Sequence, residues 1–500
     1  MTNLALNLAR SARRQGEHPA LRLDEHVLTY AQLDAAAARL ATLVRAAGVQ
    51  PGDRIGLMMP NVPAFAVIAY GVLRAGGVVV PMNPLLKARE VAYYLTDSGA
   101  RLMFVWHGMA AQAQDGAAHA GAVCQVVTPG EFEASLAATV PAADLVERAD
   151  DDAAVILYTS GTTGQPKGAE LTHAGLHLNQ EIVARTLARL TTDDVVMGCL
   201  PLFHVFGLTA GLNATLAAGA CMTLIPRFTP EKALEVIARD RVTVFEGVPT
   251  MYAAMLHAAG QGVTFDASSL RLCVSGGSAM PVEVMSAFEK VFGCIVLEGY
   301  GLSETSPVAS FNHPDRERKP GTIGTPIEGV EMRLVDDAGQ EVAPGGVGEI
   351  QIRGHNVMKG YWGRPEATAA AINAEGWFST GDLAQVDDEG YYTIVDRKKD
   401  LIIRGGYNVY PREIEEVLYE HPAVAEAAVV GIPHATLGEE IGAAVSLRPG
   451  AVATPEELLE FVKERVAAYK YPREVWLMEE LPKSSTGKIL RREVRPGGTA

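Results

Sequence analysis

The chain has 500 residues, of which 48% are hydrophobic and 20% are charged, and its formal net charge is −16. This composition predicts a folded protein that is large enough for more than one hydrophobic core. The acidic balance argues against general nucleic-acid binding, because neutralising a phosphate backbone needs a basic surface. It does not exclude a nucleotide, which needs only a local positive site.

The cysteines and the apolar runs indicate the cellular compartment of the protein and whether it spans a membrane. Five cysteines are scattered without Cys-x-x-Cys spacing. Such a sparse, odd set is typical of a reducing cytoplasm and predicts no zinc site. The longest tempting apolar run, residues 64–73, is too short to cross a membrane. We therefore expect a cytoplasmic protein with no transmembrane segment; the sequence leaves its oligomeric state open, a homo-oligomer included.

The first 150 residues alternate helical patterns with short apolar strands. An alanine-rich pattern over residues 28–47 predicts a helix, and residues 52–59 and 76–84 predict strands bounded by turns. The same rhythm returns in residues 169–310. This alternation predicts doubly wound α/β layers.

A loop rich in glycine and hydroxyl groups separates these two regions. It runs from Tyr158 to Gly168 with the sequence YTSGTTGQPKG, and it follows an apolar run, residues 153–157, that predicts a buried strand. Glycines let backbone N–H groups approach a ligand closely, and the hydroxyls and Lys167 add further donors. Such an anion-binding concavity suits a polyphosphate. The loop differs from a P-loop, because Gly168 stands where Ser or Thr would follow the lysine.

Two later motifs carry groups suited to a nucleotide. Residues 298–307, EGYGLSETSP, place the ring of Tyr300, which can stack on adenine, between glycines that permit close backbone approach. Glu304 is a hard oxygen ligand, suited to Mg²⁺ held jointly with phosphate oxygens. Asp382, in a Gly-Asp turn, is a carboxylate that can accept bonds from both ribose hydroxyls.

Residues 315–395 change to strand patterns with turns between them, which predicts a small β subdomain. A charged run, residues 396–404, follows and leads into a helical pattern with Pro411 at its start. We place a domain junction here, with residues 1–398 in a large N-terminal domain and residues 399–500 in a small α+β domain. In the small domain we expect helices over 411–419 and 455–469 and strands over 425–431 and 442–447.

These motifs, in this order and over nearly the whole chain, resemble those of the adenylate-forming superfamily. Its members are acyl-CoA synthetases, adenylation domains of peptide synthetases, and luciferases. The match extends to the phrase PLFHVFG at 201–207 and to the C-terminal signature Pro-Lys-x-x-x-Gly-Lys at 482–488. It is closest to the fatty acyl-CoA synthetases. The resemblance implies that the C-terminal domain is mobile and catalytic, with a hinge at Lys399.

The resemblance also implies a role for each matching residue. The implied catalytic residues are Lys488, which serves adenylation, Glu304, and His204, which borders the acyl carboxylate. Glu304 and Thr159 are the implied Mg²⁺ ligands. The implied ATP-binding residues are Thr159, Ser160, Gly161, Thr162, Thr163, Gly164, Lys167, Ser278, Glu298, Gly299, Tyr300, Ser303, Asp382, Arg397 and Lys488. Acyl contacts are implied for His204, Val205, Phe206, Gly276, Gly277 and Gly301, and CoA contacts for Gly405, Gly406 and Tyr407.

The activity that the resemblance implies is an ATP-dependent carboxylic acid:CoA ligase. It forms acyl-CoA through an acyl-adenylate and releases AMP and pyrophosphate. Its substrates are ATP, a carboxylic acid and CoA, and Mg²⁺ accompanies the ATP. An amino-acid substrate is not expected, because amino-acid-activating domains carry Asp near the position of His204, and a buried ammonium needs such a partner.

The acid itself is the open part of this interpretation. We expect a medium- or long-chain fatty acid first and an aryl, cinnamate-like acid second. Malonate-type ligases carry an arginine where Gly299 stands, because a second carboxylate needs such a partner. Three alternatives stay open: an acyl-AMP ligase that feeds a carrier protein, a non-catalytic homologue that only binds ligand, and a luciferase-type oxidation. The sequence contains no esterase elbow, zinc-protease motif or dinucleotide fingerprint.

Overall fold

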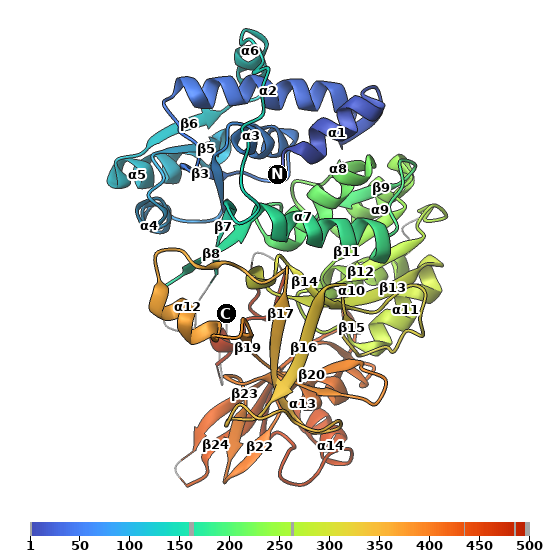
Figure 1. The fold of residues 1–500 in the computed structure, drawn as a ribbon. Helices are drawn as coiled ribbons and strands as arrows, with labels where there is room; N and C mark the ends of the chain where they lie inside the picture. The colour runs from blue at the N-terminus through green and yellow to red at the C-terminus, as the bar shows by residue number, and fades with distance from the viewer. Residues whose placement is uncertain (1–2, 160–164, 262–264, 435, 485–486, 496–500) are drawn as a thin grey trace.

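The computed structural model describes residues 3–159, 165–261, 265–434, 436–484 and 487–495 (Figure 1). Two large sheets, a four-stranded sheet and a small C-terminal sheet account for its strands. The predicted fold class, doubly wound α/β layers with a small β region and an α+β C-terminal domain, is confirmed. In this part of the chain, no helix combines the length and the apolar character needed to span a bilayer.

The first sheet lies between two pairs of helices. Its strands are β3 (Arg54–Met58), β4 (Val78–Met82), β5 (Leu102–Trp106), β6 (Val123–Val127), β7 (Ala153–Thr159), β8 (Lys167–Thr172) and β18 (Gly360–Tyr361). They pair in the order β18-β8-β7-β4-β3-β5-β6. Ile55 and Leu57 pack against α2 (Tyr30–Ala46) and α3 (Pro63–Arg74), whereas Met58 packs against α4 (Ala88–Ser98) and α5 (Ala110–Ala120). Strand β3 is therefore apolar on both faces, as a covered parallel sheet requires.

The second sheet is built in the same way. Its strands are β1 (Pro19–Leu23), β2 (His26–Thr29), β9 (Val195–Gly198), β10 (Cys221–Leu224), β11 (Val244–Gly247), β12 (Leu272–Ser275), β13 (Ile295–Gly301), β14 (Val308–Phe311) and β15 (Thr325–Pro326). They pair in the order β15-β14-β13-β12-β11-β9-β10-β1-β2. The Phe245 face packs against α9 (Pro230–Asp240), α10 (Pro249–Gly260) and α11 (Val282–Phe292). The opposite face packs against α7 (His173–Ile182), the π-helical turns η2 (Val183–Leu187) and η3 (Phe206–Asn213), and α8 (Ala214–Ala218).

The predicted β region is a four-stranded antiparallel sheet. Its strands are β16 (Val330–Val335), β17 (Gly348–Gly354), β19 (Phe378–Val386) and β20 (Tyr392–Arg397), which pair in this order. Of the short strands next to it in sequence, β15 pairs with β14 of the second sheet and β18 pairs with β8 of the first sheet. This region is therefore connected to both large sheets. The remaining short elements are α1 (Leu6–Gln15), η1 (His107–Met109), α6 (Glu131–Ala137), η4 (Ser303–Thr305), α12 (Pro365–Ala371) and η5 (Arg491–Glu493).

The C-terminal unit follows the predicted order of elements with small differences. Its elements are β21 (Ile402–Arg404), β22 (Tyr407–Val409), α13 (Pro411–Tyr419), β23 (Val424–His434), β24 (Gly438–Leu447), α14 (Pro455–Lys463) and β25 (Glu474–Leu477). Helix α14 ends six residues before the predicted end at 469. Strand β25 was not anticipated, because its four residues depend on pairing with β24 rather than on a pattern of their own.

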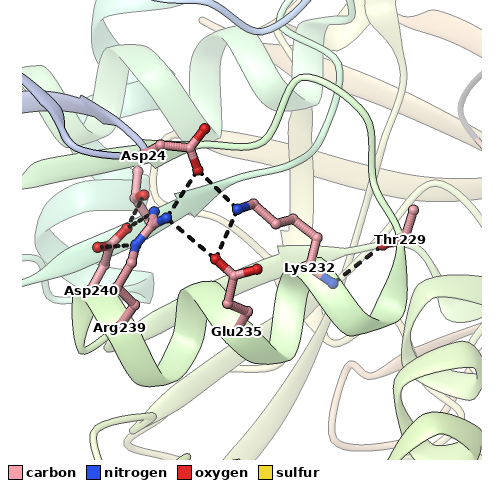
Figure 2. Close-up of polar contacts among 7 residues, drawn as sticks. Asp24, Thr229, Lys232, Glu235, Arg239 and Asp240 are labelled. Atoms are coloured by element: carbon pink, nitrogen blue, oxygen red, sulfur yellow. Dashed lines mark hydrogen bonds and ion pairs between the residues drawn. The ribbon is translucent and has the colours of Figure 1, made fainter.

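An ionic network ties α9 to the edge of the second sheet (Figure 2). Asp24, in the turn between β1 and β2, accepts bonds from Lys232 and Arg239, each at 2.9 Å. Arg239 also binds Asp240 through two nitrogens, at 2.9 and 2.8 Å. The Thr223 hydroxyl of β10 donates to the same carboxylate at 2.5 Å. The side chain of Asp240 is only 6% exposed, so its charge depends on these partners.

We predict that Arg239→Ala lowers the free energy of unfolding by about 1–3 kcal/mol, because it leaves a buried carboxylate without its cation. Lys232→Ala removes a more exposed pair and should change it by less than about 1 kcal/mol. Urea denaturation of both variants tests this.

The same experiment has a pH dependence of known sign. Burial raises the pKa of Asp240, but the hydrogen bonds from Arg239 and Thr223 outweigh burial and hold the pKa below its usual value. The stabilisation is therefore present above the unfolded pKa of about 3.9 and is lost as the pH falls below it. Equal losses for the two variants at pH 7 would contradict this assignment.

Candidate active site

The predicted magnesium ligands lie in contact. Glu304, in η4, is 8% exposed, and its Oε1 accepts bonds from the Thr159 hydroxyl at 3.2 Å and the Tyr361 hydroxyl at 3.1 Å. Thr159 ends β7 and Tyr361 ends β18, both in the first sheet, whereas Glu304 follows β13 of the second sheet, so the two large sheets meet here. The Lys167 ammonium lies 5.1 Å from the centre of the Tyr361 ring. Ser160, Gly161, Thr162, Thr163 and Gly164 lie outside the described residues.

This donor set fits Mg²⁺ held mainly by a substrate. Among the described residues, no group of three or more His, Cys, Asp or Glu side chains could hold a metal by itself. Mg²⁺ typically takes one or two carboxylates and completes its shell with waters and phosphate oxygens. Glu304 and Thr159 supply one carboxylate and one hydroxyl at the mouth of the predicted phosphate loop.

A second cluster contains the predicted nucleoside contacts. The Tyr300 hydroxyl donates to Asp382 Oδ2 at 2.5 Å, and Arg397 Nε lies 3.2 Å from Asp382 Oδ1. Asp382 and Arg397 are paired across β19 and β20, so the sheet sets their distance. Burial, reinforced by the Asp382 charge, raises the pKa of Tyr300, so its hydroxyl stays protonated. Ser303 lies nearby in sequence, at the start of η4.

Glu298 serves as an anchor for the neighbouring loop. Its Oε1 accepts the backbone N–H of Met280 at 3.2 Å, and its Oε2 accepts that of Gly321 at 3.0 Å. Burial raises the pKa of Glu298 to about 7. These bonds fix the segment that presents Gly277, with φ of +80°, and Ser278 at an exposed position. The predicted ATP contact of Glu298 is thus accompanied by a positioning role that the sequence did not indicate.

Gly276 lies against the Phe206 ring and the Gly299 carbonyl in an apolar wall. Phe206 and Gly276 are predicted acyl contacts, and Gly299 is a predicted ATP contact. A Cβ at Gly276 would lie 3.0 Å from the Phe206 ring, and Val205 is buried beside it. A Cβ at Gly299 would clash with the Phe311 ring, and one at Gly301 would clash with the Pro307 carbonyl. Because these positions are glycines, the Phe206 and Phe311 rings and the Pro307 carbonyl can pack directly against the backbone here.

His204 begins the same wall and is neutral at pH 7. Burial lowers the pKa of His204 to about 4, and the positive charge of Lys488 acts in the same direction. His204 Nδ1 accepts the backbone N–H of Phe206 at 3.4 Å. The side chain is therefore an uncharged imidazole, fixed close to Lys488.

Lys488 is carried into this site from the C-terminal unit. The Thr250 hydroxyl of α10 donates to the Gly487 carbonyl at 3.2 Å, which joins the Lys488 loop to the large domain. Within the loop, Lys488 N donates to Ser484 Oγ at 3.1 Å, and Ser484 N donates to the Lys488 carbonyl at 2.8 Å. Burial lowers the pKa of Lys488 to about 8; the charge of Arg397 adds to this and that of Asp382 opposes it.

A buried ion cluster holds the C-terminal unit in this position. Asp396, whose side chain is 2% exposed, binds Arg491 Nη1 at 2.8 Å and accepts the backbone N–H of Arg412 at 2.9 Å. Arg491 also binds Glu415 through two nitrogens, at 2.9 and 2.5 Å. Asp396 lies in β20, one residue before its end, whereas its partners belong to the C-terminal unit, so this cluster crosses the predicted junction.

The predicted hinge and CoA residues lie away from these clusters. Lys399 is exposed in the turn after β20. Gly405 and Gly406 form the turn between β21 and β22 with φ of 56° and 87°, and Tyr407 is 58% exposed and stacks on Tyr469 at 4.8 Å. In the described part of the chain, no hydrogen bond or ion pair joins this turn to the site. The CoA assignment therefore stays a prediction that requires a second orientation of the C-terminal unit.

Comparisons with known proteins decide the family. Residues 8–362 match the AMP-binding enzyme family, and residues 413–488 match the AMP-binding enzyme C-terminal domain. The chain belongs to the AMP-binding enzyme family. The predicted superfamily is thereby confirmed. The CoA-ligase relatives confirm the predicted class, an AMP-forming acid–thiol ligase that uses ATP and CoA.

Relatives of this AMP-binding enzyme match it from end to end. A long-chain-fatty-acid–CoA ligase of Bacillus subtilis (strain 168) is 38% identical over 97% of this chain and 93% of that protein. A feruloyl-CoA synthase of an Amycolatopsis species is 40% identical over 97% of each chain. The solved structure of a benzoate CoA ligase from Burkholderia xenovorans LB400 is similar with a TM-score of 0.91, at 34% identity over 99% of each chain.

Several residues at the site of this AMP-binding enzyme were missed from the sequence. Tyr361 contacts Glu304 from 57 residues away, and Arg491 contacts Asp396 from 95 residues away. A tyrosine next to a glycine, such as Tyr361, and an arginine after the lysine signature, such as Arg491, are common in sequences. Their roles could be identified only from the contacts that the fold creates. The one usable signal was the position of Arg491, three residues after Lys488.

We predict that pyrophosphate release has a falling limb in its pH profile near pH 8. Lysine is charged below its pKa, so the charge that neutralises the phosphate is present below about pH 8 and lost above it. The kcat/KM for ATP should then fall roughly tenfold per pH unit. Lys463→Ala, an exposed lysine of α14, is the control and should keep the limb. A flat profile up to pH 9.5 would contradict the assignment.

Proposed function

We propose that the chain is an ATP-dependent carboxylic acid:CoA ligase that activates an apolar monocarboxylic acid as its acyl-adenylate. The observation that carries this proposal is the position of Lys488. Its ammonium lies within electrostatic reach of His204 on the acyl side and of Arg397 and Asp382 on the nucleotide side. A cation at this junction can bridge two anions that must approach each other.

In the first step, a carboxylate oxygen of the acid forms a bond to the α-phosphorus of ATP, and the bond from that phosphorus to pyrophosphate breaks. Lys488 offsets the repulsion between the two anions as they approach. Neutral His204 can donate a hydrogen bond to the acid without adding charge. Asp382 and Arg397 hold the ribose, and Tyr300 packs against the base, so the reactants are oriented before they react.

Mg²⁺ is the metal that we propose for this site, with Glu304 and Thr159 as its protein ligands. When bound, it would neutralise charge on the phosphate oxygens. The chain's own contribution is to aim the Glu304 carboxylate, which the Tyr361 hydroxyl holds at 3.1 Å. Lys167 and the loop that precedes it add donors for the phosphates.

In the second step, the CoA sulfur forms a bond to the acyl carbonyl carbon, the bond from that carbon to AMP breaks, and the thiol proton leaves to solvent. We propose that the C-terminal unit turns about Lys399 between the steps, because Gly405, Gly406 and Tyr407 are outside the site in the present orientation. This would withdraw Lys488 and bring the turn at Gly406 beside the acyl-adenylate.

The acid that fits best is apolar and carries one carboxylate. Among the described residues, the atoms nearest to a Cβ placed at Gly276 or Gly299 include no cationic group, so this part of the wall offers no partner for a second carboxylate. A fatty acid is the first candidate and an aryl, cinnamate-like acid the second. Relatives named for long-chain fatty acids and for feruloyl-CoA agree with both. A cytoplasmic location, proposed from the sparse free cysteines, is part of the same expectation.

An acid panel tests this function. Octanoate, palmitate, cinnamate and malonate are each incubated with enzyme, ATP and Mg²⁺, with and without CoA, and AMP and acyl-CoA are quantified. We expect AMP and acyl-CoA in equal amounts, dependent on both acid and CoA, with malonate slowest. Malonate as the fastest acid would overturn the substrate class. Free acyl-AMP with no thioester would favour the acyl-AMP ligase, and no AMP with any acid would favour a non-catalytic homologue.

We predict that Lys488→Ala lowers the rate of pyrophosphate release by roughly 10²–10³, because it removes a contact made in the first transition state. The variant should still convert supplied acyl-AMP and CoA into thioester at a near-normal rate. Single-turnover assays of the two half-reactions measure this. Near-normal adenylation by the variant would refute the role of Lys488.

We predict that Lys399→Pro and Gly406→Leu impair the second step only. Proline fixes φ and so prevents a hinge from turning, whereas a leucine side chain would plug the path of the thiol arm at Gly406. Both variants should release pyrophosphate in a single turnover but form little acyl-CoA.

Lys398→Ala, the exposed neighbour of the hinge, is the matched control and should keep both half-reactions. If either test variant loses adenylation but keeps thioester formation from acyl-AMP, the hinge or the CoA path has been placed wrongly.

A further inference from the structure

One buried acid of the second sheet has a carboxyl group for which the described residues provide no hydrogen-bond or ionic partner. Glu246, in β11, is 3% exposed. Its backbone carbonyl accepts the Cys199 thiol at 3.5 Å, but within the described residues no hydrogen bond or ion pair reaches its side-chain carboxyl. Burial raises the pKa of Glu246 to about 8, so the carboxyl is mostly neutral at pH 7. Neither step described above uses it.

Glu246 lies on the face of the sheet that carries the acyl-binding wall. It is paired with Val274 of β12, and Gly276 follows Val274 by two residues, so all three belong to one face. The Gly276 N–H donates to the Gly247 carbonyl at 3.3 Å, which extends this register beyond the strand. Phe245, the neighbour of Glu246, points to the opposite face and packs with Tyr252.

The π-helical turn η3 covers both ends of this face. Its first residue, Phe206, has its ring against Gly276, whereas a Cβ at Gly211 would lie 3.2 Å from Glu246 Oε2. The helix therefore runs from the wall at which the acid is activated to the buried carboxyl. Gly211 and Gly276 have no side chains, which allows Glu246 and the Phe206 ring to lie close to their backbones.

The distance between the two points suits a small rigid acid. Two residues along a strand span roughly 6–7 Å, and one step between strands adds about 4.8 Å sideways. Glu246 thus lies roughly 8 Å from Gly276. An aromatic ring with a short unsaturated arm covers such a distance without bending, whereas a long alkyl chain would pass the carboxyl and leave it unpaired.

A neutral, buried carboxyl group can bind the hydroxyl group of a ligand. It can donate through its O–H and accept through its carbonyl oxygen. A buried polar group that finds no partner is costly, so a ligand that supplies one gains relative to a ligand that does not.

We propose that Glu246 is a specificity-determining residue of the acyl pocket, and that its carboxyl binds the ring hydroxyl of a 4-hydroxyaryl acid such as 4-hydroxycinnamate. This inference rests on the proposed function, because it uses the same pocket and the same activated carboxylate. It places the aryl acid before the fatty acid.

The test compares acids that differ only in the hydroxyl. The kcat/KM of the wild-type enzyme is measured for 4-hydroxycinnamate, cinnamate and palmitate, as CoA-dependent AMP formation. We expect 4-hydroxycinnamate to exceed cinnamate by about 10- to 100-fold. This comparison needs no variant, so it stands even if a substitution at Glu246 prevents folding. Equal values for the two cinnamates, or palmitate as the best acid, would overturn the inference.

Two variants then identify the group responsible. Glu246→Met replaces the carboxyl with an apolar side chain of similar length and should lower the 4-hydroxycinnamate value by about 10- to 100-fold while leaving cinnamate unchanged or raised. Glu246→Gln keeps a donor and an acceptor and should restore most of the preference. A parallel loss for both acids in Glu246→Met would show a merely structural role and overturn the inference.

The two proposals fail in different ways. If no acid gives AMP in the presence of CoA, the proposed function is wrong. If cinnamate or palmitate is activated normally and the hydroxyl has no effect, the function stands and only the role of Glu246 is lost.

Discussion

The buried carboxylate of Asp396 holds the segment that carries Lys488, the proposed adenylation lysine. Asp396 lies near the end of the last strand of the β region and binds Arg491, which stands three residues after Lys488. Removing either partner would leave an uncompensated buried charge, so the cluster holds one orientation of the C-terminal unit. The Thr250 contact to Gly487 adds a weaker, neutral bond at the other end of the loop. In the proposed mechanism, the first half-reaction depends on this arrangement, and the second requires that it open.

The site itself is arranged by charge. His204 is kept neutral by burial, so it does not compete with Lys488 for the acid's carboxylate. Burial and the charge of Arg397 favour the neutral form of Lys488. Anionic substrates that bind beside it favour its charged form. Asp382 is held by the Tyr300 hydroxyl and by Arg397, which keeps a carboxylate oriented beside the nucleotide side of the pocket.

The sequence was most informative where one short segment carries a whole function. The alternation of helices and strands predicted both α/β layers, and Glu304 and Lys488 stood out because their neighbours form long motifs. It could not predict Tyr361 or Arg491, because each contacts a residue of a distant segment. It could not predict the buried position of Glu246 either, because that position depends on how η3 packs on the sheet. The π-helical segment η3, which begins at Phe206, was likewise not predicted from the sequence. The roles assigned to Gly406 and Lys399 stay predictions, because the present orientation leaves both exposed.

Exchange of labelled pyrophosphate into ATP tests the central claim most directly, because it reports reversible formation of an acyl-adenylate before CoA is involved. The account predicts exchange that requires a carboxylic acid and Mg²⁺, proceeds without CoA, and falls sharply in Asp396→Asn, in which the Lys488 loop loses its anchor. Exchange that begins only when CoA is added, or ADP as the nucleotide product, would contradict it.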